Sequence, residues 1–325
     1  MKIEIEMGKK TQGNQKNSRL KLNKFMFIFW LLLSFILFEF NNGIAFLFNL
    51  STLFAPLPFA VIAMATSCPF AILLSAIASL AIALSDGFTA AITYFALFSF
   101  SGVLIAFFLK KDKPDASTFF TETIEFSIYL KLGLIVALSK LLGRNVALPN
   151  TAILQAALTP YASRLQGFDI AGSIKLLTEV ATKMLPTTLL IFVTAEVFLC
   201  YICLNRIAKK QHIKLLAMPR VSRWSFAPNL FLALFVSFAF ELAAKLNIKE
   251  LAVCEDIAFN IQQVVWAAFF IQGFAFIMYM LERKHVRPFF KYILATLSVV
   301  IGVPSCLLSL LGATDLMWNF RKLRN

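Results

Sequence analysis

The stretch FTAAITYFALFSFSGVLIAFFL, residues 88–109, decides the class of this protein. It contains no charged residue, the turn signal Ser85-Asp86-Gly87 precedes it, and Lys110 and Lys111 follow it. An α-helix needs about 20 consecutive apolar residues to cross the hydrocarbon core of a bilayer. The stretch therefore predicts a membrane-spanning helix that begins at a turn and ends at a basic boundary.

The composition of the whole chain points the same way. Of its 325 residues, 59% are hydrophobic and only 15% are charged, and the mean hydropathy is +0.78. Soluble domains carry about 25% charged residues. We therefore predict an all-α membrane protein, a polytopic bundle of transmembrane helices that forms a single domain over residues 25–321. Such a bundle leaves no room for a separate soluble catalytic domain.

Apolar runs separated by polar or basic breaks predict about nine spans, with eight as the alternative count. Proline stands near the start of two of them, at Pro58 and Pro186, where its missing N–H has no partner to lose. The predicted spans cover residues 25–40, 47–66, 70–84, 88–109, 124–142, 184–204, 227–244, 257–281 and 289–311.

The two longest segments outside the predicted spans are the N-terminal tail and one loop. Residues 1–24 form a basic tail that we expect to be disordered and cytoplasmic. Residues 143–183 form the longest loop, on the non-cytoplasmic side. The end of this loop, residues 170–183, is amphipathic, and we expect it to lie along the membrane interface.

The distribution of Lys and Arg predicts the orientation. These residues concentrate in the tail and in alternate breaks, whereas the intervening loops hold few. Basic residues favour the cytoplasmic side, so the N-terminus is expected inside. Nine spans then place Arg321, Lys322 and Arg324 outside, against the rule. Three explanations stay open: these charges are tolerated, the run near Gly302 to Pro304 bends back as a re-entrant segment, or one N-terminal span is miscounted.

The formal net charge of +14 does not indicate a nucleic-acid partner. The basic residues stand in blocks between apolar runs, which is how membrane topology is encoded. The expected partner is the lipid bilayer, and no nucleic acid. The five cysteines lie mostly within apolar segments, so no disulfide framework is indicated.

Ionisable residues deep in a span are functional candidates, because each costs several kcal/mol unless it is paired or faces water. Glu196 lies about eight residues, roughly 12 Å, from the cytoplasmic end of its predicted span. Lys131 lies at nearly the same depth in its own span. Gln272 lies about nine residues from the inner end of another. We predict a polar layer of Lys131, Glu196 and Gln272 in which the two charges neutralise each other.

Two interpretations of this layer remain open: an ion pair that only fixes helix register, or a site for a solute or a proton. Gln262 and Tyr279 join the candidate set, because both lie on the helix of Gln272. Tyr279 shares a helical face with Gln272 by its spacing of seven. Gln272 and Tyr279 either line a cavity or make hydrogen bonds between helices.

Other chemistry finds little support. Glu196, Cys200 and Cys203 share a helical face, but the only histidines, His212 and His285, lie in basic loops, so we expect no metal site. The chain has no phosphate-binding loop, no zinc-protease motif and no Gly-x-Ser-x-Gly nucleophile elbow. We therefore expect neither an enzyme nor a bound cofactor.

The ordered landmarks of the chain resemble the YybS-like bacterial membrane proteins, a family of unknown function. At the C-terminal end these are Ile271-Gln272-Gly273, an apolar run with Pro304, Leu311-Gly312, Asp315 and Asn319-Phe320-Arg321. Upstream they are Leu57-Pro58-Phe59, Leu185-Pro186, Asn205-Arg206, Trp224 and Pro228. The resemblance covers about residues 25–321.

That family is considered similar in fold to the S components of energy-coupling-factor transporters, which bind a solute and dock on a separate ATPase module. The resemblance implies small-solute binding or transport in the bacterial inner membrane, with another membrane protein such as an energising module as partner. Two features depart from S components: the first span, residues 25–40, contains no alanine, and the spans outnumber the usual six. The alternative function is a structural or regulatory membrane protein that acts through helix contacts without transport.

Overall fold

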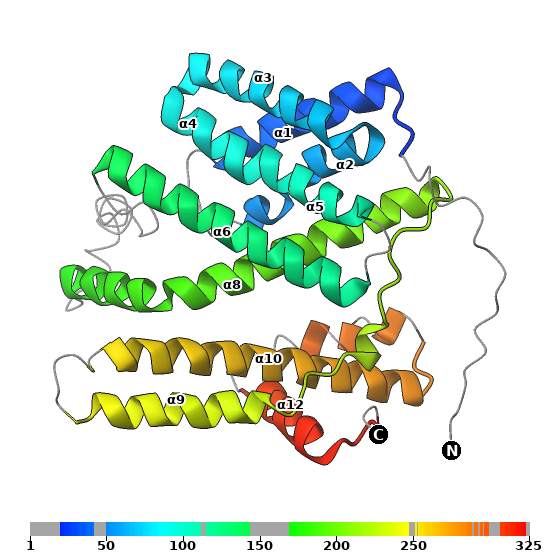
Figure 1. Cartoon of the computed structure of the whole chain (residues 1–325). Coiled ribbons are helices and arrows are strands. Elements are labelled where there is room, and N and C mark those ends of the chain that lie inside the picture. The colour runs from blue at the N-terminus through cyan, green and yellow to red at the C-terminus, as the bar shows by residue number, and fades with distance from the viewer. Residues whose placement is uncertain are drawn as a thin grey trace. The chain divides into compact units, whose positions relative to one another are not determined.

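A computed structural model describes the chain at residues 20–41, 50–111, 115–143, 169–246, 251, 253–287, 289–291, 293–294, 296–298 and 306–322. Nearly all of the basic tail and most of the loop after residue 143 lie outside these residues, so the expectations for them stay predictions. Within the described residues the regular elements are all helices (Figure 1).

The structure divides into two compact units, and the single transmembrane domain over residues 25–321 stays a prediction. The first unit contains Met1–Leu138 and Ala195–Ala217, and the second contains Ser139–Thr194 and Met218–Asn325. Two long helices, α6 (Ala116–Leu142) and α8 (Ile170–Lys210), contribute residues to both units. Each unit is described by itself below.

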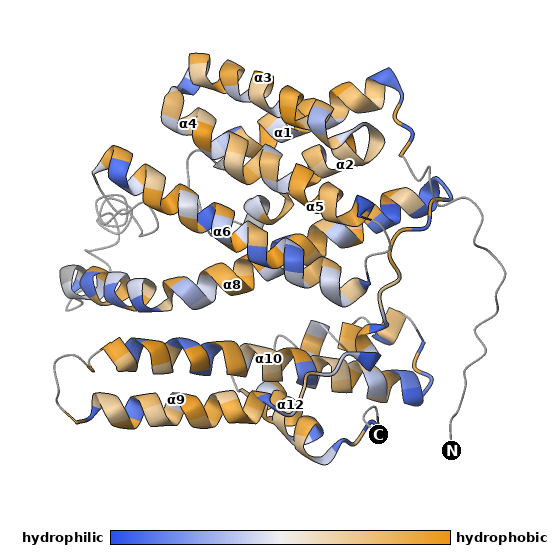
Figure 2. Cartoon of the chain, viewed as in Figure 1, coloured by the Kyte–Doolittle hydropathy of each residue, from blue (hydrophilic) through white to orange (hydrophobic). Residues whose placement is uncertain are grey.

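Apolar helices of membrane-spanning length confirm the all-α membrane class. Within the described residues four helices are long and apolar enough to cross a bilayer: Cys68–Asp86, Phe88–Lys110, Gly172–Lys210 and Val253–Arg283. Shorter apolar helices include Leu57–Ala65, Leu230–Ala244 and Leu307–Trp318. In Figure 2 hydrophobic residues dominate the helices, and hydrophilic residues gather near helix ends and in the connecting segments.

The first unit begins with a run of helices in chain order. They are α1 (Lys24–Asn41), the 3-10 helix η1 (Leu50–Phe54), α2 (Leu57–Ala65), α3 (Cys68–Asp86), α4 (Phe88–Thr93), the π-helix η2 (Tyr94–Phe100) and α5 (Ser101–Lys110). The predicted span 47–66 is thus wrong as one helix. Pro56 and Pro58 lack the N–H groups that a continuous helix would need there, and α2 is only nine residues long.

Close backbone contact joins α2 and α5. A Cβ atom on Gly102 of α5 would lie 2.7 Å from the backbone nitrogen of Ala60, so only glycine fits at this crossing. Ser67 begins α3 by accepting a hydrogen bond from the backbone N–H of Phe70 at 3.4 Å, which is an ordinary N-cap. Cys68 and Pro69 therefore lie within the first turn of α3.

Helix α8 overturns two expectations. It runs without interruption from Ile170 to Lys210, 41 residues, with Pro186 inside it rather than at its start. Residues 170–183 are the first turns of this helix rather than the end of a loop, so the predicted loop 143–183 ends before Ile170. That these turns lie along the membrane interface stays a prediction.

Asn260 of α10 (Val253–Arg283) explains how α8 continues past its proline. Its side-chain Nδ2 donates to the carbonyl of Lys183 at 2.8 Å, and the N–H of Thr187 donates to its Oδ1 at 3.2 Å. The Thr187 hydroxyl donates to the same Oδ1 at 2.7 Å. One carboxamide thus binds both backbone groups of the turn that proline disturbs.

We expect Asn260→Ala to lower the free energy of unfolding by about 2 kcal/mol, because the Lys183 carbonyl loses a donor and the Thr187 N–H loses an acceptor. Thermal denaturation of the purified protein in detergent measures the change. Thr182→Ala is the matched control, since the Thr182 hydroxyl bonds only within its own helix, to the Thr178 carbonyl. An Asn260 variant as stable as the wild type would contradict this account of the helix.

In the second unit α10 packs against α9 (Leu230–Ala244) and α12 (Leu307–Trp318). Val265, Phe269 and Leu316 form a buried core there, bordered by residues of α9. The predicted span 289–311 is wrong as one helix. Cys306 adopts a left-handed conformation, φ 54°, and the 12-residue α12 begins directly after it.

Candidate functional site

The first candidate cluster is the ion pair of Lys131 and Glu196, within the first unit. Lys131 Nζ lies 2.7 Å from Glu196 Oε2, and both side chains are 3% exposed. The pairing inferred from matched depths is therefore present. Helix α6 supplies the lysine and α8 the glutamate. Further along the same two helices, Phe119 of α6 packs against Tyr201 of α8.

Polar side chains continue along one face of α6 from this pair. Thr123, Ser127 and Lys131 follow at four-residue spacing, and all three are buried. Residues four apart lie on the same helical face. The Thr123 hydroxyl makes no hydrogen bond. The arrangement is thus a buried polar stripe, defined here as Thr123, Ser127, Lys131 and Glu196.

The ion pair leaves polar capacity unused. Lys131 Nζ and Glu196 Oε2 are in ionic contact by distance, yet neither atom has a partner at hydrogen-bonding angles. A lysine ammonium carries three donors and a carboxylate oxygen has two lone pairs. The stripe therefore presents unsatisfied donors and acceptors inside an apolar surrounding.

The cysteines beyond Glu196 belong to the packing of this unit. Cys200 lies one turn from Glu196, is buried, and its thiol contacts the backbone carbonyl of Leu53 at 3.8 Å. Across the described part of the chain, no group of three or more His, Cys, Asp or Glu side chains is arranged to hold a metal ion.

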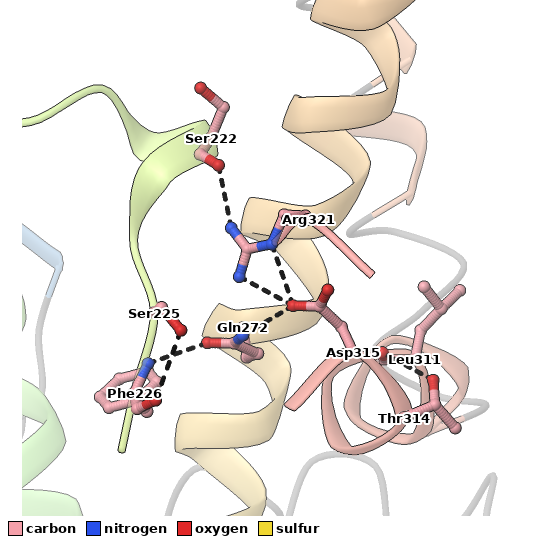
Figure 3. Close-up of polar contacts among 8 residues, drawn as sticks. All are labelled: Ser222, Ser225, Phe226, Gln272, Leu311, Thr314, Asp315 and Arg321. Atoms are coloured by element: carbon pink, nitrogen blue, oxygen red, sulfur yellow. Dashed lines mark hydrogen bonds and ion pairs between the residues drawn. The ribbon is translucent and has the colours of Figure 1, made fainter. Parts of the chain in front are cut away.

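The second cluster lies in the second unit and joins Gln272, Asp315 and Arg321 (Figure 3). Gln272 Nε2 donates to Asp315 Oδ2 at 2.7 Å, and Arg321 Nε donates to the same oxygen at 3.0 Å. The Arg321 guanidinium also lies 2.8 Å from it through Nη2. Gln272 Oε1 in turn accepts from the backbone N–H of Phe226 at 3.1 Å. All three side chains are buried.

This cluster extends to the C-terminal end of α10 through Ser222. Arg321 Nη1 donates to the Ser222 carbonyl at 2.9 Å, and the Ser222 hydroxyl donates to Glu282 Oε2 at 2.5 Å. Lys291 forms an ion pair with Glu282 at 2.5 Å. We call Lys291, Glu282, Ser222, Arg321, Asp315 and Gln272 the polar ladder.

A close helix crossing brings Asp315 and Gln272 together. A Cβ on Gly312 of α12 would lie 2.6 Å from the backbone nitrogen of Gly273, and a Cβ on Gly273 would lie 2.9 Å from the backbone carbon of Leu308. The two glycines therefore allow the backbones of α10 and α12 to touch. Asn319, in a left-handed conformation with φ 48°, then ends α12 and turns the chain so that Arg321 meets Asp315.

The remaining residues of the predicted site, Gln272, Gln262 and Tyr279, lie on α10. Gln272 makes its side-chain hydrogen bonds within the second unit, so its membership of a layer with Lys131 and Glu196 stays a prediction. Gln262 donates to Glu241 Oε2 of α9 at 3.3 Å. Tyr279 is partly buried. The contact of Gln262 thus joins α10 to α9.

The landmark residues also separate into two groups. Gly273, Gly312, Asp315 and Arg321 meet at the crossing just described. The others lie in separate segments. Pro58 lies in the first turn of α2, and Pro186 lies inside α8. The Trp224 indole donates to the Pro219 carbonyl at 3.0 Å, and the Pro228 carbonyl accepts from the Phe231 N–H at 3.0 Å.

Three residues that belong to these polar contacts or to the polar stripe have no sequence pattern that would predict their role. Ser222, Asn260 and Thr123 are ordinary polar residues, and their roles depend on partners from distant parts of the chain. An asparagine within an apolar helix is a candidate for contacts between helices. That is the one signal that could have marked Asn260.

Comparison with known proteins agrees with the helical membrane architecture. Residues 32–316 match the family described as predicted membrane protein (DUF2232). No curated protein and no solved structure matches the chain. Because the matched region covers most of the chain, the protein belongs to the DUF2232 family of predicted membrane proteins.

Proposed function

We propose that this membrane protein binds a small solute at the polar stripe of the first unit. The observation that carries the proposal is Lys131 Nζ, buried beside Glu196 at 2.7 Å with unused donors. A solute carboxylate would accept from the ammonium, and a solute amine or hydroxyl would donate to Glu196 or meet Thr123.

Energetics favour a binding role for this pair over a purely structural one. Taking two charges out of water costs several kcal/mol each, and attraction repays that cost only where geometry and further hydrogen bonds are good. Here the angles are poor and no further hydrogen bond reaches either of the two contact atoms. A polar ligand that supplies the missing partners would offset part of this cost, less the cost of desolvating its own polar groups.

The wider proposal is transport without catalysis. Its support is the resemblance to a family considered similar in fold to solute-binding S components, together with the helical membrane architecture. The protein would lie in the bacterial cytoplasmic membrane with its N-terminus inside, and it would pass its solute onward in association with a separate energising membrane protein.

Ligand-dependent stabilisation tests the binding step. The purified protein is heated in detergent with amino acids, dicarboxylates and carboxylated vitamins, and a specific ligand raises the melting temperature. We expect Lys131→Met and Glu196→Gln each to weaken binding of that ligand about tenfold or more, because each removes a charge-assisted hydrogen bond. Exchanging the two residues, Lys131→Glu with Glu196→Lys, restores stability that the single changes remove.

The matched control is Lys111→Met, which breaks the exposed pair of Lys111 and Glu122 and leaves binding unchanged. If no compound of these classes stabilises the protein, the binding proposal fails. Stable co-purification with a protein partner under those conditions would instead support the alternative, a regulatory or structural protein.

A further inference from the structure

We infer that Lys291 and Arg321 lie on the same side of the membrane, the side where α10 ends, so that the segment between them is re-entrant. The inference rests on the polar ladder of the second unit and is independent of solute binding.

Both ends of this segment meet the same residues. At its beginning, Lys291 forms an ion pair with Glu282, one residue before the end of α10 at Arg283. At its end, Arg321 donates to the carbonyl of Ser222, whose hydroxyl donates to Glu282. Glu282 thus contacts Lys291 directly and is linked to Arg321 through Ser222. The chain between them makes an even number of crossings, either none or two.

Length excludes two crossings. Lys291 and Arg321 are about 30 residues apart, which as α-helix extends about 45 Å, whereas two passages through a hydrocarbon core of about 30 Å need about 60 Å. Extended chain could cover the distance, but backbone exposed to lipid must satisfy its hydrogen bonds within a helix. The segment therefore makes no crossing.

The contacts of α12 agree with an incomplete passage. The helix has 12 residues and so extends about 18 Å, well short of the core thickness. The contacts of α12 and of Phe320 just after it fall on α10 between Val265 and Phe276, the middle of that helix. They include the Trp266 carbonyl, which accepts from the Ser309 hydroxyl at 3.2 Å, and Phe276, whose ring packs near Phe320.

Charge gives a second, independent argument. Arg283, Lys284 and Arg287 mark the end of α10 as cytoplasmic. A return of the chain places Arg321 and Lys322 on that same side. Of the three explanations for the misplaced C-terminal charges, the re-entrant segment is therefore the one we adopt, and the count of spans becomes even.

Cysteine accessibility in the full chain tests the inference. Single reporters Lys322→Cys, Lys284→Cys and Lys245→Cys are placed in a chain whose five native cysteines are replaced by serine, and intact cells are treated with a membrane-impermeant maleimide. We expect Lys322→Cys and Lys284→Cys to be labelled only after permeabilisation. Lys245→Cys, beyond the opposite end of α9, is labelled in intact cells.

Labelling of Lys322→Cys on the side opposite to Lys284→Cys overturns the inference. Should the cysteine-free chain fail to fold, fusions to Asn325 of the unaltered chain decide the matter. Green fluorescent protein fluoresces there if the C-terminus is cytoplasmic, whereas alkaline phosphatase is active there only if the C-terminus lies outside. Phosphatase activity at Asn325 contradicts the re-entrant segment.

Discussion

Gly312→Ala is expected to lower the free energy of unfolding by about 3 kcal/mol, the upper part of the range for overpacked cores. The added methyl group would lie 2.6 Å from the backbone nitrogen of Gly273 and 2.8 Å from the carbonyl carbon of Phe269. These atoms belong to a helix backbone and cannot rotate away, so α10 and α12 must separate. Gly273→Ala should act in the same direction.

The measurement is the midpoint of thermal denaturation in detergent, with Gly133→Ala as control. Gly133 lies inside α6, and a Cβ there would meet no atom within 4 Å. Alanine favours helix over glycine by about 1 kcal/mol, so the control should be neutral or more stable. Equal behaviour of the Gly312 and Gly133 variants would show that the two helices are not in backbone contact.

The second large effect is expected at the buried charges of the polar ladder. Asp315→Ala should cost about 3 kcal/mol or more, because it leaves the guanidinium of Arg321, a side chain that is 1% exposed, without its carboxylate. The Gln272 amide loses its acceptor at the same time. Since Arg321 also holds the chain to Ser222, the variant should in addition expose the C-terminus to proteolysis.

A double variant separates charge from packing. Asp315→Asn with Arg321→Gln removes both charges and keeps groups able to hydrogen-bond, so it should be more stable than Asp315→Ala. Lys245→Ala is the control, since it breaks an exposed pair with Glu241 and should cost less than about 1 kcal/mol. If the Asp315 and Lys245 variants lose the same stability, the buried cluster does not hold α12 in place.

Local features of the sequence predict the class and most helix positions. Hydrophobic length requires no knowledge of distant contacts, which is why residues 70–84, 88–109 and 257–281 all fall within apolar helices of the structure. The pairing of Lys131 with Glu196 was also predictable, because helical rise converts residue number into depth and opposite charges at one depth attract.

Predictions failed where a distant residue changes a local preference. Proline normally marks a helix start, but α8 continues past Pro186 because Asn260, 73 residues away in the chain, binds the disturbed turn. Likewise, counting apolar runs predicted one helix over residues 289–311, whereas Cys306 adopts a left-handed conformation and α12 begins only after it.

The sequence by itself determined that this is a helical membrane protein, where most of its long apolar helices lie, and which two charges meet in the first unit. All three follow from chain length, hydrophobicity and helical periodicity, which are properties of neighbouring residues. Only the tertiary structure decided that α8 passes through its proline, that Gly273 and Gly312 bring two backbones into contact, and that Arg321 returns to Ser222. Each of these features depends on contacts between residues far apart in the chain. At such buried contacts an unpaired polar group or an additional methyl group lowers the stability of the fold, so the residues present must match one another.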